Sequence, residues 1–123
     1  MSDPFFHPVS GFELPRFAGI PTFMRLPFVP PGHERFSDVQ VGLIGVPWDS
    51  GTTNRPGPRH GPRQMRDAST MIRAQHPVSG IRPFEQAACA DLGTWRSTRL
   101  IFRTAWRGSR PFTVRQWRRE SGP

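Results

Sequence analysis

V-G-L-I-G-V-P-W-D-S-G-T-T-N-R-P-G-P-R-H-G-P-R-Q-M-R, residues 41–66, is the stretch that decides the fold of this chain. Within and just before it, residues 39–46 form a short apolar run closed by a proline, which predicts a strand buried on both faces. The next segment, 49–62, is dense in Gly and Pro and predicts a loop. Pro62 then opens a predicted helix that continues to about Arg73.

A second strand is predicted at Ala87 to Leu92, after this helix. The helix itself is expected to place Met65, Ser69 and Ile72 on one face, because they are spaced i, i+4, i+7. Strand, loop, helix and strand in this order are typical of the opening of an α/β domain with a parallel sheet.

The loop after the first strand is the predicted functional segment, because ligands of parallel α/β sheets bind beyond the carboxyl ends of the strands. Its candidate site residues are Asp49, Thr52, Thr53, Asn54, Arg55 and Arg59. The alternative is that Gly and Pro only turn the chain while Asp49 and Asn54 form local side-chain turns. A phosphate loop is excluded, because no G-x-x-x-x-G-K-[ST] motif is present.

Other polar residues predict no further site. The four histidines have no spacing typical of a metal site; they are His7, His33, His60 and His76. Cys89 lies in the apolar stretch A-A-C-A and is expected to be packed rather than reactive. Because it is the single cysteine, no internal disulfide is possible, and a cytoplasmic location is expected.

Residues 1–37 form an arm rich in Phe and Pro, with too many prolines for a long helix. We expect this arm to be irregular and extended and to lie on another surface, with its Phe side chains in packing or an interface. The 123 residues include 15 Pro and 12 Gly and are 35% hydrophobic, so a self-sufficient core is not expected. No apolar run reaches the roughly 20 residues of a membrane span, so no membrane partner is expected.

Three segments resemble a known family. They are R-F-A-G-I-P-T-F-M-R-L-P (residues 16–27), the stretch 41–66 and A-D-L-G (residues 90–93), and they closely resemble the N-terminal part of the ureohydrolases. The resemblance is nearest to the agmatinase and guanidinobutyrase branch and covers about Phe12 to Gly93. It implies that residues 38–93 are the first β-α-β part of a three-layer α/β/α domain, which is incomplete in this chain.

The resemblance also implies an activity, a cofactor and partners. In ureohydrolases two bridged Mn²⁺ ions activate a hydroxide that attacks a guanidinium carbon and releases urea, and the subunits form trimers or hexamers. The expected substrate is a linear guanidino compound, with agmatine first and 4-guanidinobutyrate as the alternative. The loop segment from Asp49 to Arg59 is expected to shape substrate access or a contact between subunits.

The residues that hold the metal in the family have no counterpart in this sequence. The family supplies them from Gly-Gly-Asp-His, Asp-x-His-x-Asp and Asp-x-Asp segments that follow A-D-L-G, and none of these occurs here. No metal ligand and no catalytic residue is therefore carried over to this chain. We expect that the chain as it stands hydrolyses nothing.

Residues 94–123 differ from the rest of the chain. They hold eight Arg, three Trp and one acidic residue, and so carry most of the formal net charge of +8. With GC-rich codons and one base restored before Thr94, the neighbouring frame begins A-D-L-G-D-V and continues as an amphipathic helix. We therefore expect a frameshift after Gly93 and a disordered, solvated tail. The alternative class is a small basic protein that binds nucleic acid through Arg and Trp; specific nucleic-acid binding is not expected.

Overall fold

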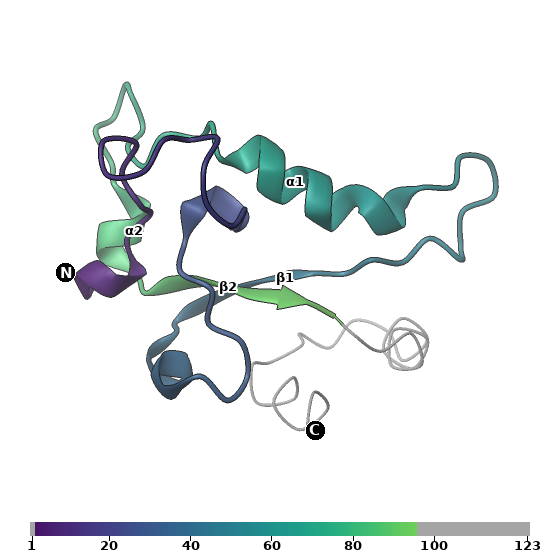
Figure 1. Cartoon of the computed structure of the whole chain (residues 1–123), viewed down its shortest axis with the longest axis horizontal. Helices are drawn as coiled ribbons and strands as arrows, with labels where there is room; N and C mark the ends of the chain where they lie inside the picture. Colours follow the sequence, from purple (N-terminus) through teal and green to yellow (C-terminus); the bar gives the residue numbers. More distant parts are fainter. Residues whose placement is uncertain (1, 96–123) are drawn as a thin grey trace.

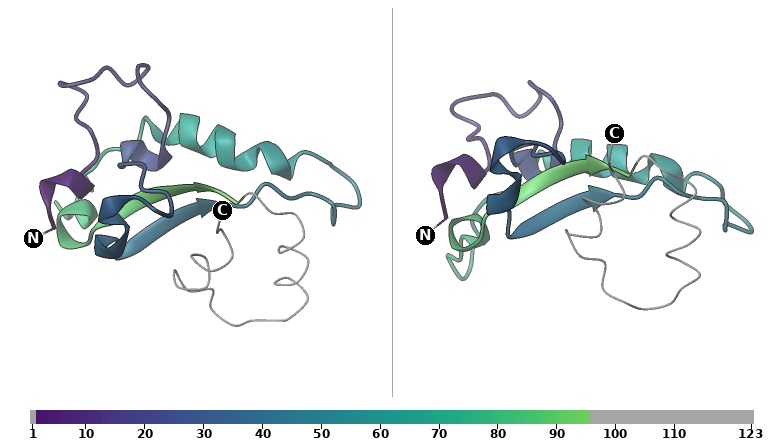
Figure 2. Two further views of the ribbon diagram at one scale, coloured as in Figure 1. Left: turned by 60° about the horizontal axis from the view of Figure 1, so that its bottom comes forward. Right: turned by 90° about the horizontal axis from the view of Figure 1, so that it is seen from below.

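The computed structural model describes residues 2–95, and two parallel strands with a helix beside them form its centre. Strand β1 (Val41–Gly45) leads through a long loop to helix α1 (Gly61–Ser69), and the short helix α2 (Pro83–Gln86) precedes strand β2 (Cys89–Thr94). The strands pair in parallel, and α1 lies along one side of them (Figures 1 and 2). The predicted α/β class and parallel pairing are confirmed.

Helix α1 is shorter than predicted. It ends at Ser69, so the predicted end near Arg73 is wrong. After Ser69 the chain continues in tighter turns, in which Met71 N–H donates to the Ala68 carbonyl and Ile72 N–H donates to the Ser69 carbonyl. Such i to i+3 bonds commonly tighten the last turn of a helix.

The inner face of α1 also differs from the prediction. Met65 is 61% exposed, whereas Ser69 is buried. The side that approaches the strands carries Pro62 and Arg66 instead: Pro62 lies against Gly45, and Arg66 forms an ion pair with Asp91. The apolar periodicity was misleading because the buried contact of this helix is polar.

Strand β1 is less covered than the buried strand that its apolar sequence predicts. Val41 is 46% exposed, and Val46, just after the strand, is 51% exposed. Among the described residues, β1 pairs only with β2, so its second edge has no neighbouring strand.

The N-terminal arm folds onto its own domain, so the expectation that it lies on another surface is wrong for much of its length. Three short 3-10 turns bend it back; they are Pro4–Phe6, Phe23–Arg25 and Glu34–Asp38. Phe6, Val29 and Phe36 from the arm join Ala88, Ala90 and Leu92 in one buried cluster. The stretch around Phe12 and Phe17 stays exposed.

The arm also pairs with the outer edge of β2. Asp91 N–H donates to the Pro27 carbonyl at 3.0 Å, and Val29 N–H donates to the Asp91 carbonyl at 2.9 Å. These bonds form a parallel bridge between Phe28 and Asp91. The outer edge of β2 is therefore occupied at this point, and a further strand has room at β1.

The turn Phe23–Arg25 contains two consecutive residues in the left-handed region. Met24 has a φ of 52° and Arg25 a φ of 60°, a conformation that costs about 1–2 kcal/mol for each non-glycine residue. Two buried polar side chains hold the turn: Phe23 N–H donates to Asp91 Oδ2 at 2.9 Å, and Met24 N–H donates to Ser69 Oγ at 2.8 Å.

Three further predictions concern the packing of Cys89, a membrane-spanning helix and the tail of the chain. Cys89 is packed as predicted, and burial raises the pKa of its thiol. None of the helices in the described part has the length and apolar character needed to cross a membrane. The first two residues of the predicted disordered tail are ordered: Thr94 ends β2, and Trp95 N–H donates to the Gly45 carbonyl at 2.8 Å. The rest of the predicted tail, from residue 96 onward, lies outside the described residues, and the frameshift stays a prediction.

Candidate functional site

The predicted functional loop follows β1 at the carboxyl end of the strand pair, and Figure 1 shows it at the end of the molecule farthest from the N-terminus. Asp49 closes this loop. Its Oδ2 atom accepts hydrogen bonds from Gly57 N–H at 2.9 Å and from Arg59 Nη1 at 2.6 Å. The Asp49 carbonyl accepts a further bond from Thr52 Oγ1 at 2.8 Å.

The charge of Asp49 is stabilised in this position. Partial burial acts to raise the pKa of Asp49, but the hydrogen bonds from Arg59 and Gly57 outweigh it and hold the pKa below its ordinary value. The Asp49 side chain is 14% exposed, whereas that of Arg59 is 54% exposed. Asp49 and Arg59 therefore act as a structural pair across the loop. The Asp49 side chain does not form the local turn of the alternative, because its partners lie eight and ten residues further along the chain.

The remaining candidates lie at the exposed tip of the loop. Thr53, Asn54 and Arg55 are exposed, and within the described part of the chain their side chains form no hydrogen bond or ion pair. Of the six predicted residues, the structure brings together Asp49, Thr52 and Arg59 and leaves the other three in solvent.

A second polar centre was not predicted from the sequence: the buried ion pair between Arg66 and Asp91. Arg66 Nε donates to Asp91 Oδ2 at 2.7 Å, and Arg66 Nη2 donates to Asp91 Oδ1 at 2.8 Å. The Asp91 side chain is 1% exposed and that of Arg66 is 11% exposed. The Arg66 guanidinium also lies over the Phe23 ring, 4.2 Å from its centroid.

This pair joins β2 to α1 near the base of the functional loop. Arg66 Nη2 donates to the Gly93 carbonyl at 2.7 Å, and Gly93 N–H donates to Asp91 Oδ1 at 2.8 Å. Gly93 has a φ of 91° and lies where the strand register shifts. Two features of the sequence could have indicated this pair. Asp91 is a charged residue inside a predicted buried strand, and Arg66 is a residue of opposite charge in the predicted helix that begins at Pro62.

Neither polar centre is suited to hold a pair of metal ions. Each Asp91 carboxylate oxygen already accepts a bond from Arg66 and one from a backbone amide. Asp49 is likewise engaged by Arg59 and Gly57. Residues 2–95 contain no group of three or more His, Cys, Asp or Glu side chains that could hold a metal ion. The described residues therefore do not fit a binuclear metal centre.

Comparison with known proteins identifies the family. The profile described as "Arginase family" matches residues 39–115, which is more than half of the chain. The chain belongs to the arginase family. The match extends beyond Gly93, the point at which the resemblance was expected to stop, and the frameshift stays a prediction.

Individual relatives agree with this assignment. The chain is 54% identical to a guanidinopropionase of Pseudomonas aeruginosa over 76% of the chain and 28% of the relative. It is 44% identical to a guanidinobutyrase of the same organism over 70% of the chain and 27% of the relative. Proclavaminate amidinohydrolase from Streptomyces clavuligerus has a similar solved structure, with a TM-score of 0.63 and 37% identity over 74% of this chain and 30% of that one.

These comparisons confirm the predicted fold, an incomplete α/β piece of the arginase fold. The chain spans less than a third of the length of these relatives. The residues that the family profile matches, 39–115, include the strand, loop, helix and strand described above.

Proposed function

We propose that this chain represents the amino-terminal part of a ureohydrolase that cleaves a linear guanidino acid into an amine and urea. The main support for this proposal is the 54% identity to a guanidinopropionase across a segment that contains the loop, α1 and both strands. The guanidinobutyrase, at 44% identity, also acts on a guanidino acid by its name. These relatives favour a guanidino acid over agmatine, which the sequence alone had placed first.

The described residues contribute the access loop and its support rather than the chemistry. Asp49 and Arg59 fix the shape of the loop, and Thr53, Asn54 and Arg55 are presented at its tip. Metal-assisted hydrolysis of a guanidinium group would require ligands from elsewhere in the domain, with manganese as the proposed metal. A trimer or hexamer is the proposed assembly, and the loop tip is a candidate contact within it.

The test uses the frame-restored protein, which we define as residues 1–93 followed by the continuation encoded in the neighbouring frame. Urea release is measured with Mn²⁺ on guanidinopropionate, guanidinobutyrate and agmatine. We expect the highest kcat/KM on one of the two guanidino acids. A clear preference for agmatine would reject the substrate proposal, and no urea from any guanidino compound would reject the activity as well.

We also propose that the 123-residue chain is inactive by itself. The support comes from the carboxylates of the two polar centres, which would be the candidate metal ligands. Asp49 is paired with Arg59, and Asp91 is paired with Arg66. The purified chain is assayed with Mn²⁺ against a sample treated with a chelator. Urea release above the chelated control would overturn this proposal.

A further inference from the structure

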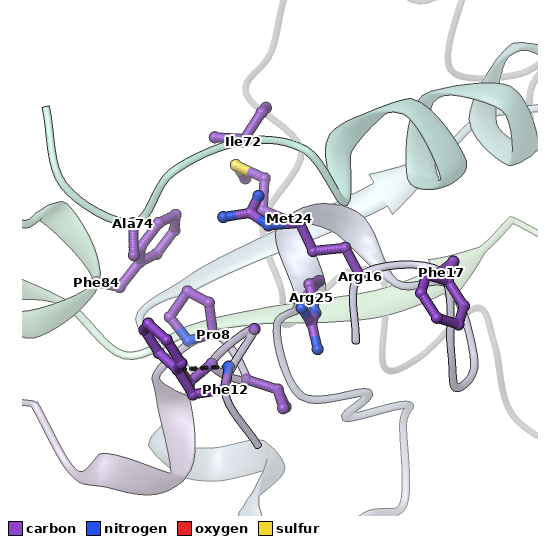
Figure 3. Close-up of a pocket in the computed structure, with 12 residues that line it drawn as sticks. Pro8, Phe12, Arg16, Phe17, Met24, Arg25, Ile72, Ala74 and Phe84 are labelled. Atoms are coloured by element: carbon purple, nitrogen blue, oxygen red, sulfur yellow. Dashed lines mark hydrogen bonds between the residues drawn. The ribbon is translucent and has the colours of Figure 1, made fainter. Parts of the chain in front are cut away.

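A hollow of about 640 Å³ lies between the arm, the segment after α1 and helix α2. Its lining is a mixture of aromatic, aliphatic and basic side chains, among them Phe12, Phe17, Met24, Phe84, Arg16 and Arg25 (Figure 3). The lining residues come from parts of the chain that are far apart in sequence: the arm, the segment after α1 and helix α2. The hollow is separate from the loop of the proposed function, because α2 lies before the start of β2 and the loop lies beyond the end of β1.

Positive charge is concentrated in this hollow although residues 1–93 are nearly neutral, with nine Arg and eight acidic residues. Four of these arginines form ion pairs with carboxylates; they are Arg35, Arg59, Arg66 and Arg82. Arg16 and Arg25 form none with any described residue. Arg73 adds a further guanidinium in the adjoining hollow.

Both arginines of the hollow are positioned but not saturated. Arg16 Nη1 donates to the Thr70 carbonyl at 3.2 Å, and Arg25 Nη2 donates to the Leu14 carbonyl at 2.6 Å. A guanidinium has five N–H donors, so each side chain retains donors for a carboxylate. Bidentate pairing of Arg with a carboxylate is among the stronger hydrogen-bonding interactions in proteins.

The strained turn supplies an independent observation. Met24 and Arg25 both line the hollow, and they are the two left-handed non-glycine residues of the described chain. The buried side chains of Asp91 and Ser69 hold this turn in place. Strain of this kind is retained where the surrounding structure enforces it, and it often occurs at binding sites.

The apolar part of the lining indicates what kind of ligand fits. Phe12 is fully exposed and Phe17 is 94% exposed, so both protrude beside the hollow instead of enclosing it. Exposed aromatic side chains beside arginines are typical of the residues that dominate protein interfaces. A chain segment that lies across them covers more of this apolar surface than a small enclosed molecule would.

We propose that this hollow binds a segment of a partner protein in which a carboxylate side chain stands next to an aromatic or large aliphatic one. The carboxylate pairs with Arg16 and Arg25, and the apolar side chain packs on Phe12 and Phe17. Residues 94–123 are an unsuitable occupant, because they hold eight Arg and one acid. Further strands of the same domain have room at β1, since the arm already pairs with β2.

The test measures binding of a fluorescein-labelled peptide containing Asp-Leu-Phe-Asp to the 123-residue chain, by anisotropy at physiological salt and low temperature. The double variant R16Q/R25Q should raise the Kd of the peptide by about tenfold or more, because it removes both charged donors to the carboxylate. The matched control R55Q/R63Q removes the same charge from two other exposed arginines and should leave Kd unchanged. Phe12→Ser should weaken binding, whereas Val78→Ser, at a side chain that is 90% exposed elsewhere, should not.

Three results would overturn the proposal. Equal losses in R16Q/R25Q and R55Q/R63Q would show that the peptide only follows the net positive charge. Undiminished binding of a peptide with Ser in place of Leu and Phe would show that the apolar part has no role. Sedimentation that shows a dimer of the chain, dissociated by R16Q/R25Q, would assign the hollow to a second copy instead of a partner protein.

Discussion

At the scale of single residues, Asp91 connects three parts of the chain through one carboxylate. It holds the arm through Phe23 N–H, helix α1 through Arg66, and the irregular end of β2 through Gly93 N–H. A buried ion pair is not in itself strong evidence of net stability, because both charges lose their hydration. The role of this pair is to position three elements, because the arm turn, helix α1 and the end of β2 all bind the same two carboxylate oxygen atoms.

Removing one partner of this pair should therefore be costly. We expect Asp91→Ala in the frame-restored protein to lower the free energy of unfolding by about 3–5 kcal/mol, because the buried Arg66 charge is left without its partner. The matched control is Asp38→Ala, which removes a surface pair with Arg35 whose side chains are 31% and 48% exposed, and should cost less than about 1 kcal/mol. Urea denaturation measures both, and similar values for the two variants would contradict the role given to Asp91.

The lowered pKa of Asp49 predicts that the hydrogen bonds within the loop depend on pH. Its pKa in the folded chain is below the ordinary value of 3.8, so the loop contacts of the carboxylate are fully present above that pH. They are lost as the pH falls through the lower folded pKa, where protonation removes the acceptor for Arg59 and Gly57. The protection factor of the Gly57 amide, which is its exchange relative to an unstructured peptide at the same pH, should therefore stay high at neutral and mildly acidic pH and fall below about pH 3.8.

The control for this prediction is Asp49→Asn, which keeps the shape of the side chain but lacks its charge. Gly57 exchange in this variant should be faster at neutral pH and should show no acid transition of its own. A Gly57 transition of the same size in both proteins would assign it to general acid unfolding instead of Asp49.

At the scale of elements, the sequence predicted the order and type of the main segments, and the errors have definable causes. Parallel strands around a loop and helix follow from local patterns: an apolar run, a Gly- and Pro-rich turn, and a proline at a helix start. The inner face of α1 was missed because its decisive contact joins Arg66 to Asp91, 25 residues apart, and apolar periodicity carries no signal for an ion pair. The folding back of the arm was missed for a similar reason, since it depends on long-range contacts with β2.

The candidate site was predicted as a segment but not as a geometry. Gly and Pro located the loop, and its position after a parallel strand was the reason to predict a functional role for it. The division between the structural residues Asp49 and Arg59 and the free residues at the tip depends on which side chains meet across the loop. That pairing spans ten residues and follows from the folded path of the chain rather than from residue types.

The close approach of α1 to β1 leads to a third prediction. A Cβ added at Gly45 would lie 2.6 Å from Pro62 Cβ, and the proline ring has little freedom to move. Gly45→Ala should therefore lower the free energy of unfolding of the frame-restored protein by about 1–3 kcal/mol through overpacking. Gly61→Ala is the control, because Gly61 has helical φ and ψ and no neighbouring atom within 4 Å of an added Cβ. It should be neutral or stabilising by up to about 1 kcal/mol, and a loss at Gly61 equal to that at Gly45 would contradict the packing argument.

At the scale of the whole molecule, the described part lacks the neighbours that a parallel sheet normally has. Two strands pair with each other, the arm covers one point of the outer edge, and β1 has an unpaired second edge among the described residues. Ten hydrophobic residues are buried in this part, while large apolar side chains such as Ile20 and Met71 remain exposed. A parallel sheet is usually covered on both faces and extended by further strands, so the unpaired edge is where the rest of an arginase-family domain would attach.

This incompleteness gives the last prediction, on the cooperativity of unfolding. A two-stranded pair with a small core is only marginally stable in water, so the 123-residue chain should lose its circular dichroism gradually on heating and bind the dye ANS even when cold. The frame-restored protein is expected to add strands at β1 and to cover apolar side chains along this strand, such as Val41 and Val46. It should therefore melt in a single sharp transition and bind little dye. Asp91→Ala should lower the melting temperature of the frame-restored protein but have little effect on the gradual curve of the short chain, because that chain has no cooperative transition to shift. A sharp melt of the 123-residue chain, with a calorimetric enthalpy equal to its van't Hoff enthalpy, would show that residues 2–95 fold without a completed sheet.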